Sequence, residues 1–219
     1  MTDMTYCHLT TRRNKNKPFW QLPKRRRNCL PITIIRTYDT LNADVKGDFG
    51  YGWTLDIVTT EISIVIGNGQ TAQKGFLQNE PIQDGTHITI TLPDGTKEGF
   101  TFQAKSLSSG FAKSPYYYPN WVPDVGTKST LSVPQTLLYA WGDGTYYMMD
   151  DYGDGMNDYS PASGSGFLTL TLRNGVDLVI DATTGKLCEA IDLNGNKLTF
   201  SDHGITHSSG KGVVFERDI

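Results

Sequence analysis

The chain has 219 residues, of which 37% are hydrophobic, and it is rich in glycine (23), tyrosine (11) and proline (10). This composition favours tight turns between modest strands, and no long helical pattern is present, so we expect an all-β fold. The formal net charge of −3 divides into +7 for residues 1–30 and −10 for the remainder, and an acidic body argues against a nucleic-acid partner.

The cysteines and the apolar runs exclude further classes. Cys7, Cys29 and Cys188 are far apart and odd in number, which argues against a closed disulfide framework and a cysteine zinc site. The sequence gives no physical reason for Cys188. No apolar run reaches the roughly 18 residues of a membrane span, and no secretory signal follows the start. We therefore expect no membrane span and leave the localisation open.

Two regions are predicted from patterning. Residues 1–30 lack periodicity and are mostly basic and polar, which predicts a disordered leader. Its cluster Lys24–Arg27 could be an address or an arm for an anionic surface, but a solvated leader is the simpler interpretation. Residues 31–219 are predicted to form one all-β domain of consecutive antiparallel hairpins in a curved meander.

A glycine-spaced aromatic cluster follows the first β-branched run. It reads Phe49-Gly50-Tyr51-Gly52-Trp53. The glycines allow sharp backbone bends, and we expect Phe49 and Trp53 to place apolar area beneath the turn.

Three pairs of alternating runs predict hairpins. HITITL and KEGFTFQA flank Pro93–Thr96, LLYAW and YYMM flank Gly142–Thr145, and FLTLTL and VDLVID flank Arg173–Gly175. Asn-Gly pairs at 174–175 and 194–195 predict two-residue type I′ turns. Threonines alternate with isoleucine or leucine in 88–92 and 168–172, which indicates one buried face and one solvent face.

Residues 104–135 interrupt this pattern. Prolines at 115, 119, 123 and 134 predict a long loop without a central strand. Its aromatic residues could form a platform for a sugar or a peptide, or could cover the open end of the sheet as a lid. The candidate binding residues are Tyr116, Tyr117, Tyr118 and Trp121.

The segment MMDDYGDGMNDYS offers the best metal candidate. Its carboxylates, Asp150, Asp151, Asp154 and Asp158, are hard oxygen ligands that suit Ca²⁺. However, Tyr152 occupies the third position of an EF-hand-like loop and the bidentate glutamate is missing, so an acidic, solvated turn is the alternative. Ser163–Gly166 lacks a nucleophile elbow, and His203 and His207 are interpreted as turn histidines. We therefore expect no catalysis and no required cofactor.

Residues 173–218 have a period close to ten. Apolar runs at 176–180, 187–191, 198–200 and 213–215 are each closed by small or polar turn residues, which predicts a β meander. The last run would be an edge strand with unpaired backbone groups, which predicts pairing with further repeats in cis or with another copy.

Two stretches resemble the Rhs or YD-repeat proteins. TTGKLCEAIDLNGNKLTFSDHGI resembles a repeat with its Asp-x-x-Gly-Asn turn at Asp192, Gly195 and Asn196, although Ser201-Asp202 replaces the usual Tyr-Asp. The upstream segment matches the region before the repeats at Arg36, Tyr38, Phe49, Gly50, Gly52 and Trp53.

The resemblance implies a structural role without catalysis. In that family, a ribbon of hairpins spirals into a shell, often around a toxic cargo, in secreted or cell-surface proteins. Family shells hold many more repeats than this chain, so we expect either a fragment or a chain that joins other copies. The alternative is a carbohydrate- or peptide-binding β module that uses residues 116–121.

Overall fold

The computed structural model describes residues 30–32, 36–47, 50–55, 61–65, 71–72, 82–92, 95–107, 116–140, 144–149, 156–161 and 166–216. These residues contain strands and turns but no helix, and every strand pair is antiparallel, which confirms the all-β prediction. Within these ranges, therefore, nothing helical is available to cross a membrane.

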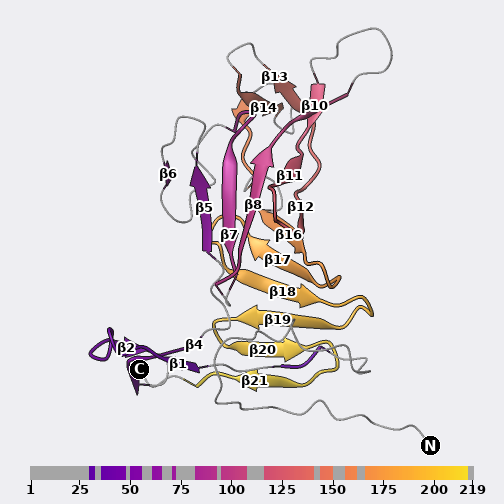
Figure 1. Cartoon of the computed structure of the whole chain (residues 1–219). Coiled ribbons are helices and arrows are strands. Elements are labelled where there is room, and N and C mark those ends of the chain that lie inside the picture. Colours follow the sequence, from indigo (N-terminus) through magenta and orange to yellow (C-terminus); the bar gives the residue numbers. More distant parts are fainter. Residues whose placement is uncertain are drawn as a thin grey trace, which may run out of the picture.

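The largest sheet, which we call the ribbon, has seven strands in the order β12-β16-β17-β18-β19-β20-β21 (Figure 1). Apart from β12, the strands follow chain order, so each one is joined to the next by a hairpin. The strands are β12 (Thr130–Ser132), β16 (Phe167–Thr171), β17 (Asp177–Asp181), β18 (Leu187–Ile191), β19 (Lys197–Ser201), β20 (Gly204–His207) and β21 (Gly212–Val214).

Another large sheet has the order β11-β8-β7-β5-β6. We call it the first sheet, because it begins earlier in the chain than the other two large sheets. Its strands are β5 (Glu61–Val65), β6 (Thr71–Ala72), β7 (His87–Thr91), β8 (Lys97–Phe102) and β11 (Trp121–Pro123). Upstream of it, β1 (Arg36–Tyr38) pairs with β4 (Trp53–Leu55), and β2 (Lys46–Gly47) pairs with β3 (Gly50–Tyr51).

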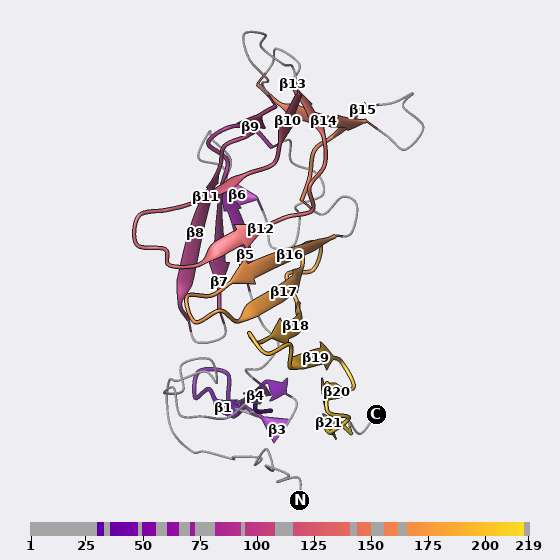
Figure 2. The same ribbon diagram turned by 90° about the vertical axis from the view of Figure 1, so that its right-hand side faces the viewer.

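The third sheet, which we call the tyrosine sheet, has the order β15-β14-β13-β10-β9. Its strands are β9 (Lys105–Ser106), β10 (Tyr116–Tyr118), β13 (Leu138–Ala140), β14 (Tyr146–Met149) and β15 (Met156–Asp158). Figures 1 and 2 show this sheet at one end of the molecule and β21 at the other, with the first sheet and the start of the ribbon between them.

The three predicted hairpins and the closing meander are confirmed. β7 pairs with β8, β13 with β14 and β16 with β17, while β17 to β21 pair in succession. The predicted alternation also holds, because Ile88, Ile90, Leu168 and Leu170 are fully buried while the threonines between them are partly exposed. The meander contains one strand more than its apolar runs indicated, namely β20.

The predicted two-residue type I′ turns are wrong. In four turns the N–H of the first residue donates to the carbonyl oxygen four residues later, and the glycine N–H donates back to the first residue, at 2.7–2.9 Å. Three residues therefore lie in each loop, with the glycine at φ between 77° and 81°. A left-handed glycine in the third place is the signature of a hairpin with a G1 bulge. The turns are Leu92–Thr96, Leu172–Val176, Asp192–Asn196 and His207–Lys211.

His207 ends β20 and begins the turn to Lys211, as predicted for a turn histidine, but the residue is buried, with only 6% exposed. Its Nδ1 accepts the N–H of Ser209 at 2.9 Å. Its Nε2 has no hydrogen-bond partner in the described part of the chain. His203 does lie in the tight turn between β19 and β20, as predicted.

The region predicted as a proline-rich loop instead joins the three large sheets. Between 105 and 132 the chain contributes β9 and β10 to the tyrosine sheet, β11 to the first sheet and β12 to the ribbon. β10 is an inner strand, contrary to the prediction, because Tyr116–Tyr118 contains no proline and fits between Pro115 and Pro119. Pro123 ends β11 at a sheet edge, where a missing N–H is tolerated.

Cys188 is the extra residue of a β-bulge. Val179 pairs with Glu189, but the next residue, Ile180, pairs with Leu187, so Cys188 is left without a partner across the ladder. The bulge shifts the alternation, and both Leu187 and Ala190 consequently face the core. Partial burial is the main reason that the pKa of the Cys188 thiol is raised above its ordinary value.

Phe102 lies where the sheets meet. Its ring is fully buried and packs against three aromatic rings, Trp121 at 5.2 Å, Tyr146 at 5.5 Å and Tyr159 at 5.8 Å between centroids. Burial raises the pKa of Tyr159 well above its ordinary value, and the nearby Trp121 N–H only partly offsets this. Neither Trp121 Nε1 nor Tyr159 OH reaches a hydrogen-bonding geometry with the described residues.

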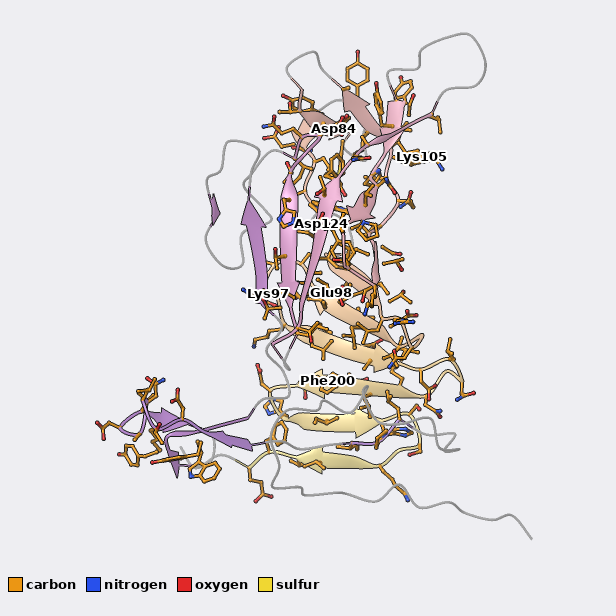
Figure 3. The ribbon with its side chains drawn as sticks, viewed as in Figure 1. Asp84, Lys97, Glu98, Lys105, Asp124 and Phe200 are labelled. Atoms are coloured by element: carbon orange, nitrogen blue, oxygen red, sulfur yellow. The ribbon has the colours of Figure 1, made fainter. Side chains whose placement is uncertain are left out.

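A hydrogen-bonded bridge reinforces the same junction. Tyr146 OH donates to Asp84 Oδ2 at 2.9 Å, and the Ala104 N–H donates to Asp84 Oδ1 at 2.9 Å. Figure 3 shows Asp84 beside the tyrosine sheet, although its residue precedes β7 of the first sheet. Burial, and secondly the Asp84 carboxylate, raise the pKa of Tyr146, so its hydroxyl remains a donor at neutral pH.

Truncation of Phe102 to alanine should lower the free energy of unfolding by about 3–5 kcal/mol, because three rings lose their common packing partner. Urea unfolding measures this change. Phe167→Ala is the matched control, since Phe167 is 42% exposed on β16 and its loss should cost less than about 1 kcal/mol. Equal destabilisation by the two variants would contradict this account of the junction.

Candidate functional site

The β21 edge of the ribbon, which has no neighbouring strand among the described residues, is the first candidate site. β21 pairs with β20 through Val213 and Ile205, and the Phe215 N–H donates to the His203 carbonyl at 2.9 Å. Because hydrogen bonding alternates along an antiparallel strand, the backbone groups of Gly212 and Val214 point away from β20. Val214 is 76% exposed. This edge can accept the backbone of one more strand.

The tyrosine sheet presents the second candidate. Tyr116 lies opposite Tyr139, and Tyr139 lies opposite Tyr147, so three tyrosines on three adjacent strands share one face. We call this set the tyrosine row. Tyr118, two residues after Tyr116, lies on the same face of β10. Tyr116 is 37% exposed, and the other three side chains are partly exposed.

The structure separates the four aromatic residues that the sequence grouped together. Tyr116 and Tyr118 belong to the outer face just described. Tyr117 lies on the opposite face, where its ring packs edge-on against Tyr146 at 5.5 Å. Trp121 is 4% exposed on β11 of the first sheet. The sequence analysis did not include the other two members of the row, Tyr139 and Tyr147. They come from the LLYAW–YYMM hairpin, whose alternating pattern could have identified them.

Of the calcium candidates, only Asp158 lies in the described part of the chain; Asp150, Asp151 and Asp154 lie outside it. Asp158 is exposed at the end of β15, opposite Tyr147. Within the described residues, no three His, Cys, Asp or Glu side chains gather into a possible metal site.

The Asp-x-x-Gly-Asn turn is held by the carboxylate of Asp192. Its Oδ1 accepts the N–H groups of Asn194 at 2.8 Å and Asn196 at 2.9 Å, and its Oδ2 accepts Asn196 Nδ2 at 2.8 Å. Burial is the largest single influence and raises the pKa of Asp192, but these hydrogen bonds together outweigh it and lower the pKa below the ordinary value. Gly195 supplies the left-handed residue at φ 77°.

The glycine–aromatic motif forms a separate hairpin unit. Arg36 begins β1, and Tyr38 lies opposite Trp53 with ring centroids 5.2 Å apart. A Cβ at Gly52, whose φ is 72°, would meet the Tyr38 ring at 2.6 Å. Gly50 also has positive φ, at 104°, whereas Phe49 lies outside the described residues. Trp53 is only partly buried and Tyr38 is 47% exposed, so this pair packs ring on ring rather than beneath a core.

One polar cluster was missed by the sequence analysis. His87 Nε2 contacts Asp124 Oδ2 at 2.5 Å, and Thr101 Oγ1 donates to Asp124 Oδ1 at 2.9 Å (Figure 3). The His87–Asp124 pair packs against the backbone of Gly99. A side chain would not fit at this position, because a Cβ at Gly99 would clash with the Asp124 carboxylate. Thr127 Oγ1 accepts a hydrogen bond from the Gly99 N–H and donates one to the Gly99 carbonyl oxygen, both at 3.1 Å.

This cluster resembles the orienting half of a catalytic triad, in which a carboxylate positions an imidazole. Among the described residues, however, no nucleophilic side chain hydrogen-bonds to His87. The geometry therefore acts as a tie between the first sheet and the segment that follows β11. His87 and Thr101 could have been paired from the hairpin register, but Asp124 lies 37 residues from His87 in a segment without a pattern.

Comparison with protein-family models, with curated proteins and with solved structures finds no match for this chain. Function must therefore be argued from the geometry and from the residues themselves.

Asp192→Asn should lower the free energy of unfolding by about 1 kcal/mol at pH 7, because an amide cannot accept all three hydrogen bonds. Since the pKa of Asp192 is depressed on folding, the stabilisation is present above the unfolded pKa and is lost as the carboxylate protonates. The difference from wild type should be full above about pH 5 and shrink below about pH 4. Chemical unfolding at several pH values measures it.

Asp202→Asn provides the matched control, because the Asp202–Lys186 pair at 3.1 Å is exposed and surface ion pairs contribute little. A pH-independent effect of Asp192→Asn would show that the carboxylate does not hold the turn.

Gly99→Ala should cost about 1–3 kcal/mol, because the new methyl group displaces the Asp124 carboxylate. The same substitution in an Asp124→Ala background should cost much less, since the clashing group is gone. A double-mutant cycle of unfolding free energies measures the coupling. Additive effects would mean that Gly99 is not required by the His87–Asp124 pair.

Proposed function

We propose that this chain forms a section of a curved β wall, with a structural rather than a catalytic role. The observation that supports this function is the ribbon, in which β16 to β21 are added in chain order by short hairpins and end on an open edge. A sheet built in this way is extended by repeating the same hairpin. The resemblance of residues 183–205 and 210–218 to YD repeats points in the same direction.

The next strand would come from further repeats in cis or from another copy of the chain, and it would pair with β21. The three residues of β21 contain no proline and no charge, two devices by which edge strands prevent addition. By the same resemblance, such a wall would surround a toxin-like cargo in a secreted or cell-surface protein.

The two ends of the ribbon differ in a way that favours growth at β21. At the other end, β12 follows β11 of the first sheet in the chain, and β11 carries Trp121, whose ring packs against Phe102. At the β21 end, the last side chain of the strand is largely exposed. Growth of the wall at β21 leaves the junction undisturbed.

Association through this edge can be tested by sedimentation over a range of protein concentrations. Wild-type protein should self-associate as concentration rises, and Val214→Pro should remain monomeric, because proline removes the N–H that points away from β20. Val214→Thr keeps that N–H and should associate like wild type. A wild-type protein that stays monomeric, with slow amide exchange throughout residues 213–216, would contradict pairing with another copy.

A further inference from the structure

The outer face of the tyrosine sheet has no assigned role in the wall. Its opposite face is packed into the core, with Leu138 fully buried and Tyr146 6% exposed. The outer face carries the tyrosine row, and Figures 1 and 2 show it at the end of the molecule away from β21. The strands that carry these tyrosines are about 4.8 Å apart, and the rings of Tyr116 and Tyr139 lie 5.9 Å apart between centroids.

We propose that the tyrosine row binds a neutral, extended β-1,4-linked oligosaccharide that lies across the strands. The distance from strand to strand is comparable to the length of one pyranose in such a chain. Successive sugars can therefore place their C–H faces against successive rings, whose π faces carry partial negative charge. This inference goes beyond the wall function and does not depend on it.

The polar groups beside the row favour a sugar over a peptide. Asp158 lies directly opposite Tyr147, and Lys105 lies directly opposite Tyr118 at the other end of the face (Figure 3). The carboxylate can only accept hydrogen bonds, so its ligand must bring donors. Sugar hydroxyls supply them at every unit, whereas a proline-rich peptide, the usual ligand of tyrosine-lined grooves, lacks N–H groups at its prolines.

The charges also indicate a neutral ligand. One acidic and one basic side chain flank the row at opposite ends, so these two described residues add no net charge to the face. A polyanion such as a nucleic acid would meet Asp158 without a basic cluster to hold its phosphates.

The shape of the row favours a soluble oligosaccharide over a crystalline polymer surface. The rings of Tyr116 and Tyr139 are 5.9 Å apart and inclined at 64°. Such a face is stepped rather than flat, so it fits a single chain whose sugar rings turn from unit to unit. Contact with only three or four sugars also implies modest affinity.

Titration calorimetry with β-1,4-linked hexasaccharides of glucose and of N-acetylglucosamine tests the proposal. At least one of them should bind saturably. Tyr139→Ala should weaken binding at least tenfold, about 1.4 kcal/mol, because it removes the central ring. Tyr139→Phe should keep most of the affinity, since the stacking face remains. Tyr116→Ala, which alters the most exposed ring of the row, is a second variant with less risk to folding.

Two controls separate this site from the rest of the molecule. Tyr117→Phe alters the opposite face of β10, and Val214→Pro alters the ribbon edge; neither should change sugar binding. The proposal is overturned if neither hexasaccharide binds, if Tyr139→Ala and Tyr116→Ala bind as tightly as wild type, or if decaproline binds at the row while the sugars do not.

Discussion

Each strand of the ribbon depends on the next one. A strand in this sheet has one face buried in the core and one in solvent, and its backbone groups on a side without a neighbouring strand are left to bind water. Short hairpins supply that neighbour at once, so β16 to β21 form without long-range searching. Among the described residues, β21 has a neighbouring strand on one side only, and we propose this edge as the place where the molecule meets a partner.

The β12 end of the ribbon is instead connected to the other two large sheets. A single segment, residues 105–132, enters each of the three sheets in turn, and the side chains of Phe102, Trp121, Tyr146 and Tyr159 fill the space where those sheets meet. The first sheet supplies Phe102 and Trp121 and the tyrosine sheet supplies Tyr146, so these two sheets share one aromatic cluster. The junction thus provides a fixed base from which a ribbon can extend, and it also holds the tyrosine row on a rigid strand framework.

Local patterns were enough to predict the hairpins but not the site. The alternation in 88–92 and the glycine turns are local patterns, because each involves residues close together in the sequence. They were therefore enough to predict the β7–β8 and β16–β17 pairs. The burial of Trp121 and the separation of Tyr117 from Tyr116 depend on which sheet each short strand joins, which no local pattern specifies.

The details that were missed share a similar cause. The loops closed by Gly175 and Gly195 hold one residue more than an Asn-Gly pair indicates, and the bulge at Cys188 breaks an alternation without any glycine or proline to mark it. The tie between His87 and Asp124 arises only from tertiary packing. The resemblance to YD repeats implied a ribbon of hairpins but could not say which side chains face outward.

Hydrogen exchange at β21 tests the central claim most directly. A chain extended after Ile219 by a second copy of residues 182–216 would offer β21 a further hairpin of its own kind. The account predicts that the Val214 amide then exchanges at least tenfold more slowly, because its N–H gains a partner, while amides in β17 are unchanged. An unchanged exchange rate at Val214 in a folded, extended chain would contradict the claim that this edge is built to continue.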